Sequence, residues 1–200
     1  MSLAKLHEIS EQEYLAGELQ SDIKHEYIDG QIYAMAGAHR NHVLIADKIL
    51  RRFGNHFEKQ PCRSYSSDLK VKIGKNYFYP DVIVDCTDFD GYFTEQPTIV
   101  VEVLSKSTRQ YDKTFKRDQY FSIPTLQEYL LIEQDIAEIE YWQRTENNIW
   151  QQNVYYLGDD LYLRSIDLTI SVEDIYQGVK NEDVQTWLET KLQEQSEHGQ

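Results

Sequence analysis

A glutamate interrupts one of the most apolar stretches of the chain. The run Ile99-Val100-Val101-Glu102-Val103-Leu104 is typical of a strand that is buried on both faces, and Glu102 is its only charged member. Burying an unpaired carboxylate is costly, so such a group is normally paired with a cation, protonated or bound to a metal. Glu102 is therefore a candidate functional residue. The alternative is a structural ion pair with a buried lysine or arginine.

A second carboxylate, Asp81, opens another apolar stretch, Val82-Ile83-Val84, directly after Pro80. Proline is tolerated at the start or the edge of a strand, so Asp81 is expected where the strand begins. Asp81 and Glu102 are 21 residues apart, which is enough for two neighbouring strands and one connection. Two converging carboxylates suit Mg²⁺ or Mn²⁺, and the ion would activate a water and neutralise phosphate charge. The alternative for Asp81 is a residue that caps a turn.

The elements that must position these carboxylates alternate between helical and strand patterns. Ser10 and Glu13 form a capping-box pattern for a short helix over 10–17, and Asp29-Gly30 predicts the turn of a hairpin over 25–35. Apolar spacing predicts helices over 41–57 and 108–122 and a polar helix from about residue 181. Strands are expected over 64–73, 78–85, 98–104, 128–133, 138–144, 150–157 and 161–168. The chain is therefore expected to form a mixed α/β (α+β) domain.

Composition limits the classes of protein to which the chain can belong. Its 200 residues predict a single domain, and 15 Tyr, 7 Phe and 3 Trp exclude general disorder. The two cysteines, Cys62 and Cys86, are too few for a disulfide-rich scaffold or a CxxC-type zinc site. The sequence shows no apolar stretch long enough to span a membrane and no signal peptide. We therefore expect a cytoplasmic protein without a membrane partner.

The net charge of −14 argues weakly against a polyanionic partner. One local exception is the segment 106–117, in which five basic residues accompany the single acid Asp112. Those five are Lys106, Arg109, Lys113, Lys116 and Arg117. The sequence therefore leaves room for a local nucleic-acid contact on this segment.

These motifs, in this order and spacing, resemble the Uma family of bacterial restriction-endonuclease-like proteins, within the PD-(D/E)xK nuclease superfamily. The matching residues are Tyr79-Pro80-Asp81, Val101 to Ser105, Ser107-Thr108, Asp112, Lys116, Tyr120, the hairpin Glu26 to Gly30, and His42. The resemblance covers about residues 14–133. It implies a central mixed β-sheet flanked by helices, a Mg²⁺-dependent site and DNA as the substrate.

The chain departs from the superfamily motif at Leu104, where a lysine is expected two residues after the glutamate. The resemblance implies Lys116 as its replacement. Lys106, which shares the strand parity of Glu102, and Lys113 are rivals. Without the resemblance, Asp112 and Lys116 would be an ordinary helix-surface pair.

Four other residues are candidates with ordinary alternatives. His42 falls on the apolar stripe of its helix and could be a hydrogen-bonded core residue, and Glu26 could be a solvated strand residue. Ser105 could be a turn residue rather than a phosphate contact, and the Val103 carbonyl is a possible third metal ligand. The acidic C-terminal helix is expected to be solvated or to form a dimer contact.

The sequence therefore predicts a Mg²⁺- or Mn²⁺-dependent DNA endonuclease with catalytic residues Asp81, Glu102, Lys116 and Glu26 and a metal held by Asp81, Glu102 and Val103. We expect one restriction-endonuclease-like domain over 1–200, comprising a helix and hairpin (1–38), a nuclease core (39–133), a β extension (134–180) and an acidic tail (181–200). A homodimer would suit a duplex target. The alternatives are a catalytically inactive binding or assembly module of the same fold, which Leu104 and the negative charge favour, and a hydrolase of a smaller phosphoester.

Overall fold

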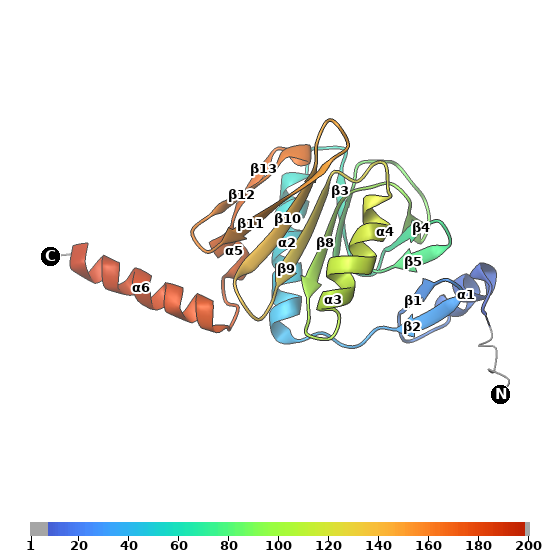
Figure 1. The fold of residues 1–200 in the computed structure, drawn as a ribbon, viewed down its shortest axis with the longest axis horizontal. Helices are drawn as coiled ribbons and strands as arrows, with labels where there is room; N and C mark the ends of the chain where they lie inside the picture. Colours follow the sequence, from blue (N-terminus) through green and yellow to red (C-terminus); the bar gives the residue numbers. More distant parts are fainter. Residues whose placement is uncertain (1–7, 199–200) are drawn as a thin grey trace.

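A six-stranded mixed sheet forms the centre of the molecule, which is described over residues 8–198 by a computed structural model. Its strand order is β11-β10-β9-β8-β6-β3 (Figure 1). The strands are β3 (Arg63–Ser66), β6 (Val82–Asp85), β8 (Pro97–Leu104), β9 (Glu128–Glu133), β10 (Glu138–Arg144) and β11 (Trp150–Tyr156). Only β8 and β9 pair in parallel, and the other pairs are antiparallel. The expected central mixed sheet is therefore present.

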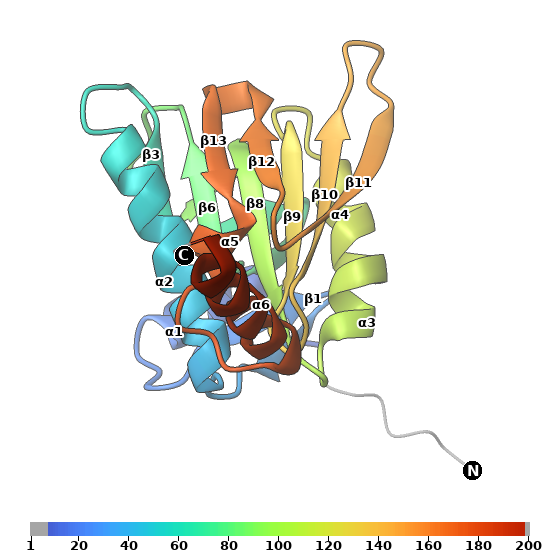
Figure 2. The ribbon, with the colours of Figure 1, turned by 90° about the vertical axis from the view of Figure 1, so that its left-hand side faces the viewer.

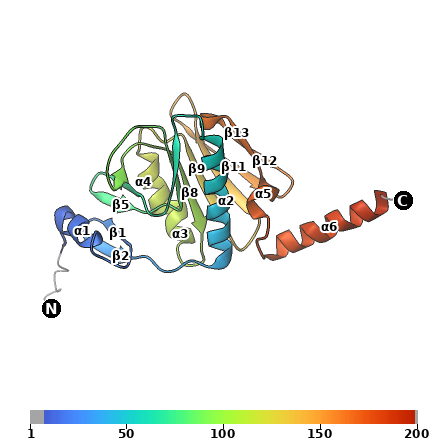
Figure 3. The ribbon, with the colours of Figure 1, turned by 180° about the vertical axis from the view of Figure 1, so that it is seen from behind.

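Helices cover both faces of this sheet. Figures 2 and 3 show α2 (Arg40–His56) on one face, and a continuous helix on the opposite face. The continuous helix is built from α3 (Arg109–Tyr111), the π-helical segment η1 (Asp112–Lys116) and α4 (Arg117–Phe121). Each face has its own apolar core. On the α2 face, Ile45, Ile49 and Phe53 pack against Val82, Val84, Ile99, Val101 and Val103. On the α4 face, Tyr120 and Leu126 pack against Ile83, Val100, Leu104 and Leu131.

A second sheet brings the N-terminal hairpin beside the core, with strand order β2-β1-β5-β4-β7. Its strands are β1 (His25–Ile28), β2 (Gln31–Ala34), β4 (Lys70–Ile73), β5 (Asn76–Phe78) and β7 (Phe93–Thr94). The hairpin turns at Asp29 and Gly30, both with positive φ, as the Asp-Gly sequence predicted. Helix α1 (Glu11–Glu18) begins with the predicted Ser10–Glu13 capping box.

Three of the expected strands are each two separate elements. The stretch 64–73 divides into β3 and β4, which lie in different sheets, and 78–85 divides into β5 and β6 around Tyr79-Pro80-Asp81. The stretch 161–168 holds β12 (Asp160–Leu163) and the 3₁₀ turn η2 (Arg164–Ile166) before β13 (Leu168–Ser171). Proline explains the second break, because Pro80 cannot donate a ladder hydrogen bond.

The C-terminal region adds a small two-stranded sheet, β12-β13, and two helices, α5 (Val172–Tyr176) and α6 (Glu182–His198). The sequence analysis did not predict α5. Figure 1 shows α6 projecting from the body of the molecule. No helix within residues 8–198 is long and apolar enough to cross a membrane.

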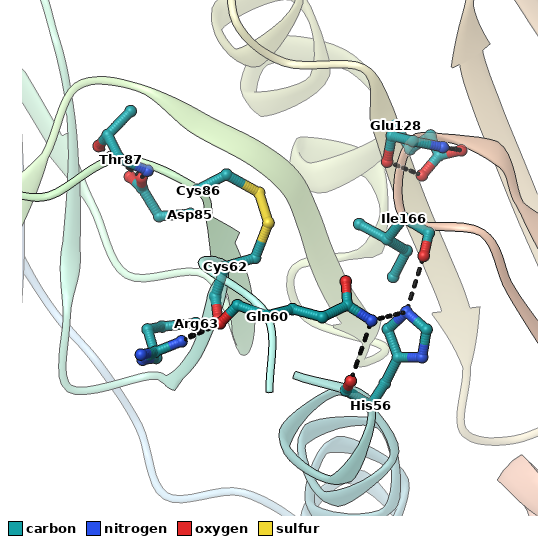
Figure 4. Close-up of a disulfide and its surroundings, with 10 residues drawn as sticks. His56, Gln60, Cys62, Arg63, Asp85, Cys86, Thr87, Glu128 and Ile166 are labelled. Atoms are coloured by element: carbon teal, nitrogen blue, oxygen red, sulfur yellow. Dashed lines mark hydrogen bonds between the residues drawn. A yellow bond between two sulfur atoms is a disulfide. The ribbon is translucent and has the colours of Figure 1, made fainter. Parts of the chain in front are cut away.

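A disulfide joins Cys62 and Cys86, the residues that flank the β3–β6 pair (Figure 4). Arg63 faces Asp85 in that pair, so the two cysteines are the next residues in register. Beside the disulfide, the buried Asp85 carboxylate accepts hydrogen bonds from the amide and hydroxyl of Thr87 and from the hydroxyl of Thr94. This end of the central sheet is therefore fixed both covalently and by hydrogen bonds.

Candidate active site

The two carboxylates, Asp81 and Glu102, are neighbours across the β6–β8 pair of the central sheet. Val82 pairs with Val101 across the antiparallel β6–β8 ladder, so the next residues in register are Asp81 and Glu102. Residues two positions further along each strand, Ile83 and Leu104, pack in the core on the α4 face. Because side chains alternate along a strand, Glu102 is directed to that face as well, where it contacts Lys116 and Tyr120.

Asp81 is held at the start of β6 by two hydrogen bonds. Its Oδ2 accepts from the backbone amide of Val103 at 2.7 Å, and its Oδ1 lies 2.8 Å from Nε2 of His42. Helix α2 thus contributes His42 to the site from the opposite side of the sheet. The Ile45-Ile49-Phe53 stripe is fully buried, whereas the His42 side chain is 17% exposed. His42 is therefore a partner of Asp81 rather than a core residue of the helix stripe.

Lys116 lies at the centre of a buried cluster of carboxylates. Its Nζ is 2.7 Å from Oε1 of Glu26, 3.2 Å from Oε1 of Glu102 and 3.6 Å from Oδ1 of Asp112. Lys116, Glu26, Glu102 and Asp112 are all more than 90% buried. The pair of Asp112 and Lys116 is thus buried, and the alternative of an ordinary helix-surface pair is not what the structure shows. Both residues belong to the π-helical segment η1, and such segments occur frequently at functional sites.

Burial and neighbouring charges shift the acid–base properties of this cluster. Burial raises the pKa of Glu102 well above its ordinary value; Lys116 opposes the shift, and Asp112, Asp81 and Glu26 add to it. Burial also raises the pKa of Asp112. For Lys116, burial alone would lower the pKa, but Glu102, Glu26 and Asp112 outweigh it and raise the pKa well above the ordinary value. Lys116 therefore keeps its proton, and the cluster favours binding of a further proton or cation.

The hairpin strand β1 supplies Glu26. Its Oε1 contacts Lys116 and also accepts a hydrogen bond from the backbone amide of Tyr79 at 3.3 Å. Glu26 is 8% exposed, so the solvated strand residue considered from sequence is not what the structure shows. The family resemblance was the signal that found it.

Two tyrosines, Tyr120 and Tyr111, contact or border this cluster. The hydroxyl of Tyr120 donates to Oε1 of Glu102 at 3.0 Å. The ring of Tyr111 lies with its centroid 6.0 Å from the Lys116 Nζ. Their apolar neighbours on the helix favoured a core assignment, and only the position of Tyr120 within the family motif pointed to the site.

Three of the candidate residues lie away from the cluster. Lys113 pairs with Glu133 at 3.2 Å and with Glu140 at 2.5 Å, so the structure does not bring it to Glu102. Lys106 is exposed in the turn after β8, which ends at Leu104, so the strand-parity argument for it does not hold. Ser105 accepts a hydrogen bond from the Thr108 amide and lies 3.0 Å from the hydroxyls of Ser107 and Thr108, as expected for a turn residue before a helix.

The donor set is suited to a hard divalent cation bound by few protein ligands. Within residues 8–198, no three His, Cys, Asp or Glu side chains are grouped as a ready-made metal cage. Mg²⁺ commonly needs only one or two carboxylates and keeps several waters. Asp81 and Glu102 are the two neighbouring carboxylates that such an ion would use. Because the N–H and C=O groups of one strand residue point to the same neighbouring strand, the Val103 carbonyl faces the Asp81 side together with its amide.

Comparison with solved structures supports the fold. A crystal structure described as a "putative nuclease belonging to DUF820" from Anabaena variabilis ATCC 29413 superposes with a TM-score of 0.71 and 18% sequence identity. The match covers 86% of this chain and 99% of that chain. The fold class expected from the sequence, a mixed sheet flanked by helices as in the restriction-endonuclease-like proteins, is therefore confirmed.

Sequence comparison identifies relatives along most of the chain. An uncharacterized protein from Synechocystis sp. (strain ATCC 27184 / PCC 6803 / Kazusa) is 40% identical over 181 residues, which are 88% of this chain and 95% of that protein. A second uncharacterized protein of the same strain is 35% identical over 145 residues, 69% of this chain and 82% of that protein. The model of the Uma2 family, described as "Putative restriction endonuclease", matches residues 11–173. The chain therefore belongs to the Uma2 family.

Proposed function

We propose that this chain is a Mg²⁺- or Mn²⁺-dependent endonuclease that hydrolyses phosphodiester bonds of DNA. The observation that carries the proposal is the position of Lys116. Its ammonium group lies 3.2 Å from Glu102, although Leu104 occupies the strand position where the superfamily motif has its lysine. A lysine from the helix after β8 thus lies beside Glu102, whose neighbour across the β6–β8 pair is Asp81. The Uma2 description supports nuclease chemistry.

Each residue of the site has a distinct proposed role. Asp81, Glu102 and the Val103 carbonyl would hold the cation, which when bound would supply an activated water and neutralise charge on the scissile phosphate. His42 orients Asp81 through the 2.8 Å hydrogen bond, and Tyr120 orients Glu102. Glu26 and Asp112 keep the Lys116 ammonium beside Glu102. Lys116, protonated, would stabilise the negative charge that develops on the phosphate oxygens.

The test of this proposal is nicking of a supercoiled plasmid by the purified chain in the presence of Mg²⁺ or Mn²⁺, with EDTA as the metal-free control. We expect Lys116→Met to lower the nicking rate by about 10²- to 10⁴-fold, the range that one positioned catalytic group provides. Lys113→Met is the matched control, because Lys113 lies on the same helix and pairs with Glu133 and Glu140 instead. Equal loss in both variants, or nicking that survives Glu102→Gln, would contradict the assignment.

A second measurement distinguishes the loss of metal binding from the loss of catalysis. In calorimetric titration with Mn²⁺, Asp81→Asn should lose binding, whereas Lys116→Met should retain it while losing nicking.

The second candidate function, an inactive binding or assembly module, is favoured by Leu104 and by the net charge of −14. That module would fold normally and show neither Mn²⁺ binding at Asp81 nor nicking.

A further inference from the structure

An exposed aromatic ring borders the buried cluster at the edge of the second sheet. Tyr33 lies directly opposite Glu26 in the β1–β2 hairpin. Directly opposed residues of an antiparallel pair project from the same face with neighbouring side chains. Glu26 contacts Lys116, so Tyr33 flanks the site on its outer side. Strand β2 is the edge of its sheet, and the Tyr33 side chain is 53% exposed.

The basic residues around the site are already neutralised. Of the five in segment 106–117, four pair with carboxylates: Arg109 with Glu133, Lys113 with Glu133 and Glu140, Lys116 with Glu26 and Glu102, and Arg117 with Asp118. Lys106 alone of the five forms no ion pair within residues 8–198. Binding to duplex DNA depends strongly on lysines and arginines that neutralise phosphates. The segment that looked basic in the sequence therefore offers little of that binding energy.

We propose that the site accepts an unpaired nucleotide of a DNA strand, with its base stacked on the exposed face of Tyr33. The inference rests on the proposed function, because it assumes that a DNA phosphate enters the Lys116 cluster. Stacking on aromatic rings is the usual way to bind single strands without many charges, and any base can stack. The acidic surface would disfavour an intact duplex, which presents more phosphate charge per unit length.

Fluorescence anisotropy with a labelled oligothymidylate and a labelled duplex of equal length tests this inference. Wild-type protein is measured in Ca²⁺ and in EDTA, and a gel verifies that the DNA stays intact. We expect the single strand to bind more tightly than the duplex. Tyr33→Ala should weaken single-strand binding about tenfold, as removal of one stacking ring does. Tyr33→Phe should retain wild-type affinity, because the ring face remains.

Tyr162→Ala is the matched control, because Tyr162 is a strand tyrosine of similar exposure in β12. It should leave binding unchanged. Equal or tighter binding of the duplex, or a change of less than twofold for Tyr33→Ala, would overturn the inference even if the wild-type protein nicks DNA. Conversely, binding that depends on Tyr33 without any nicking would retain the inference and refute the hydrolytic function.

Discussion

At the scale of residues, the site is defined by an excess of negative charge in a buried volume. Glu26, Glu102 and Asp112 surround one lysine, Lys116. Asp81 is the neighbour of Glu102 across the β6–β8 pair and contacts His42. Carboxylates that are buried together disfavour ionisation of one another. Such an arrangement costs stability in the metal-free protein. Functional sites commonly lower the stability of the folded protein in this way, and the bound ligand or ion offsets the loss.

This cost can be measured through the pH dependence of unfolding. The Glu102 pKa is raised in the folded protein and ordinary, about 4.5, in the unfolded chain. Between those two values the folded state binds more protons, so the free energy of unfolding falls as pH rises. Glu102→Gln does not titrate. In EDTA, its stability relative to wild type should therefore increase by about 1 kcal/mol or more between pH 5 and pH 8, since one pKa unit corresponds to about 1.4 kcal/mol.

Urea denaturation at the two pH values provides the measurement. The exposed Glu58 supplies the control, because Glu58→Gln should show no such difference. A stability difference between Glu102→Gln and wild type that is the same at pH 5 and pH 8 would show that Glu102 has an ordinary pKa in the folded protein.

At the scale of elements, the helix that follows β8 provides Lys116, whereas β8 itself has Leu104 at the position of the motif lysine. The π-helical segment η1 places Asp112 and Lys116 inward together, with Tyr120 one turn later. The sequence predicted the strands of Asp81 and Glu102 because an acid within an apolar run is a strong signal. Periodicity alone could not decide between Lys113 and Lys116, which lie three residues apart on one short helix, and only the family resemblance favoured Lys116. The apolar pattern also could not show that β5 and β6 are two strands, because both are largely apolar and they differ in the sheet that they join.

The β3–β6 pair carries its own prediction, through the disulfide between Cys62 and Cys86. The two cysteines are 24 residues apart, and closing a loop of that length typically stabilises a protein by about 2–4 kcal/mol. Reduction of the purified protein should lower its free energy of unfolding by that amount. The double variant Cys62→Ser, Cys86→Ser should match the reduced protein and be insensitive to reductant. Two titratable thiols in the native protein purified under oxidising conditions would contradict the pairing.

At the scale of the whole molecule, the C-terminal helix α6 is the element least integrated with the rest. Val184 is buried near its start, the Trp187 ring contacts Gly158, and the Asp183 carboxylate accepts a hydrogen bond from the Ala137 amide. Further along, Leu188 and Leu192 are 56% and 66% exposed and lie one turn apart on α6. Figure 1 shows that this helix projects from the body of the molecule. Apolar residues spaced by four on an unsupported helix are suited to packing against another helix.

These two leucines make the homodimer predicted from sequence testable without disturbing the site. If α6 forms the contact, sedimentation velocity should give the full chain about twice its 23.7 kDa mass, and Leu188→Glu with Leu192→Glu should give the monomer. Both side chains are exposed, so the melting temperature of the separated monomer at low concentration should stay unchanged. Ile149→Glu, an exposed apolar residue before β11, is the control and should leave the dimer intact. A full chain that sediments as a monomer at tens of micromolar would refute the dimer, while a dimer that resists the double substitution would place its interface away from α6.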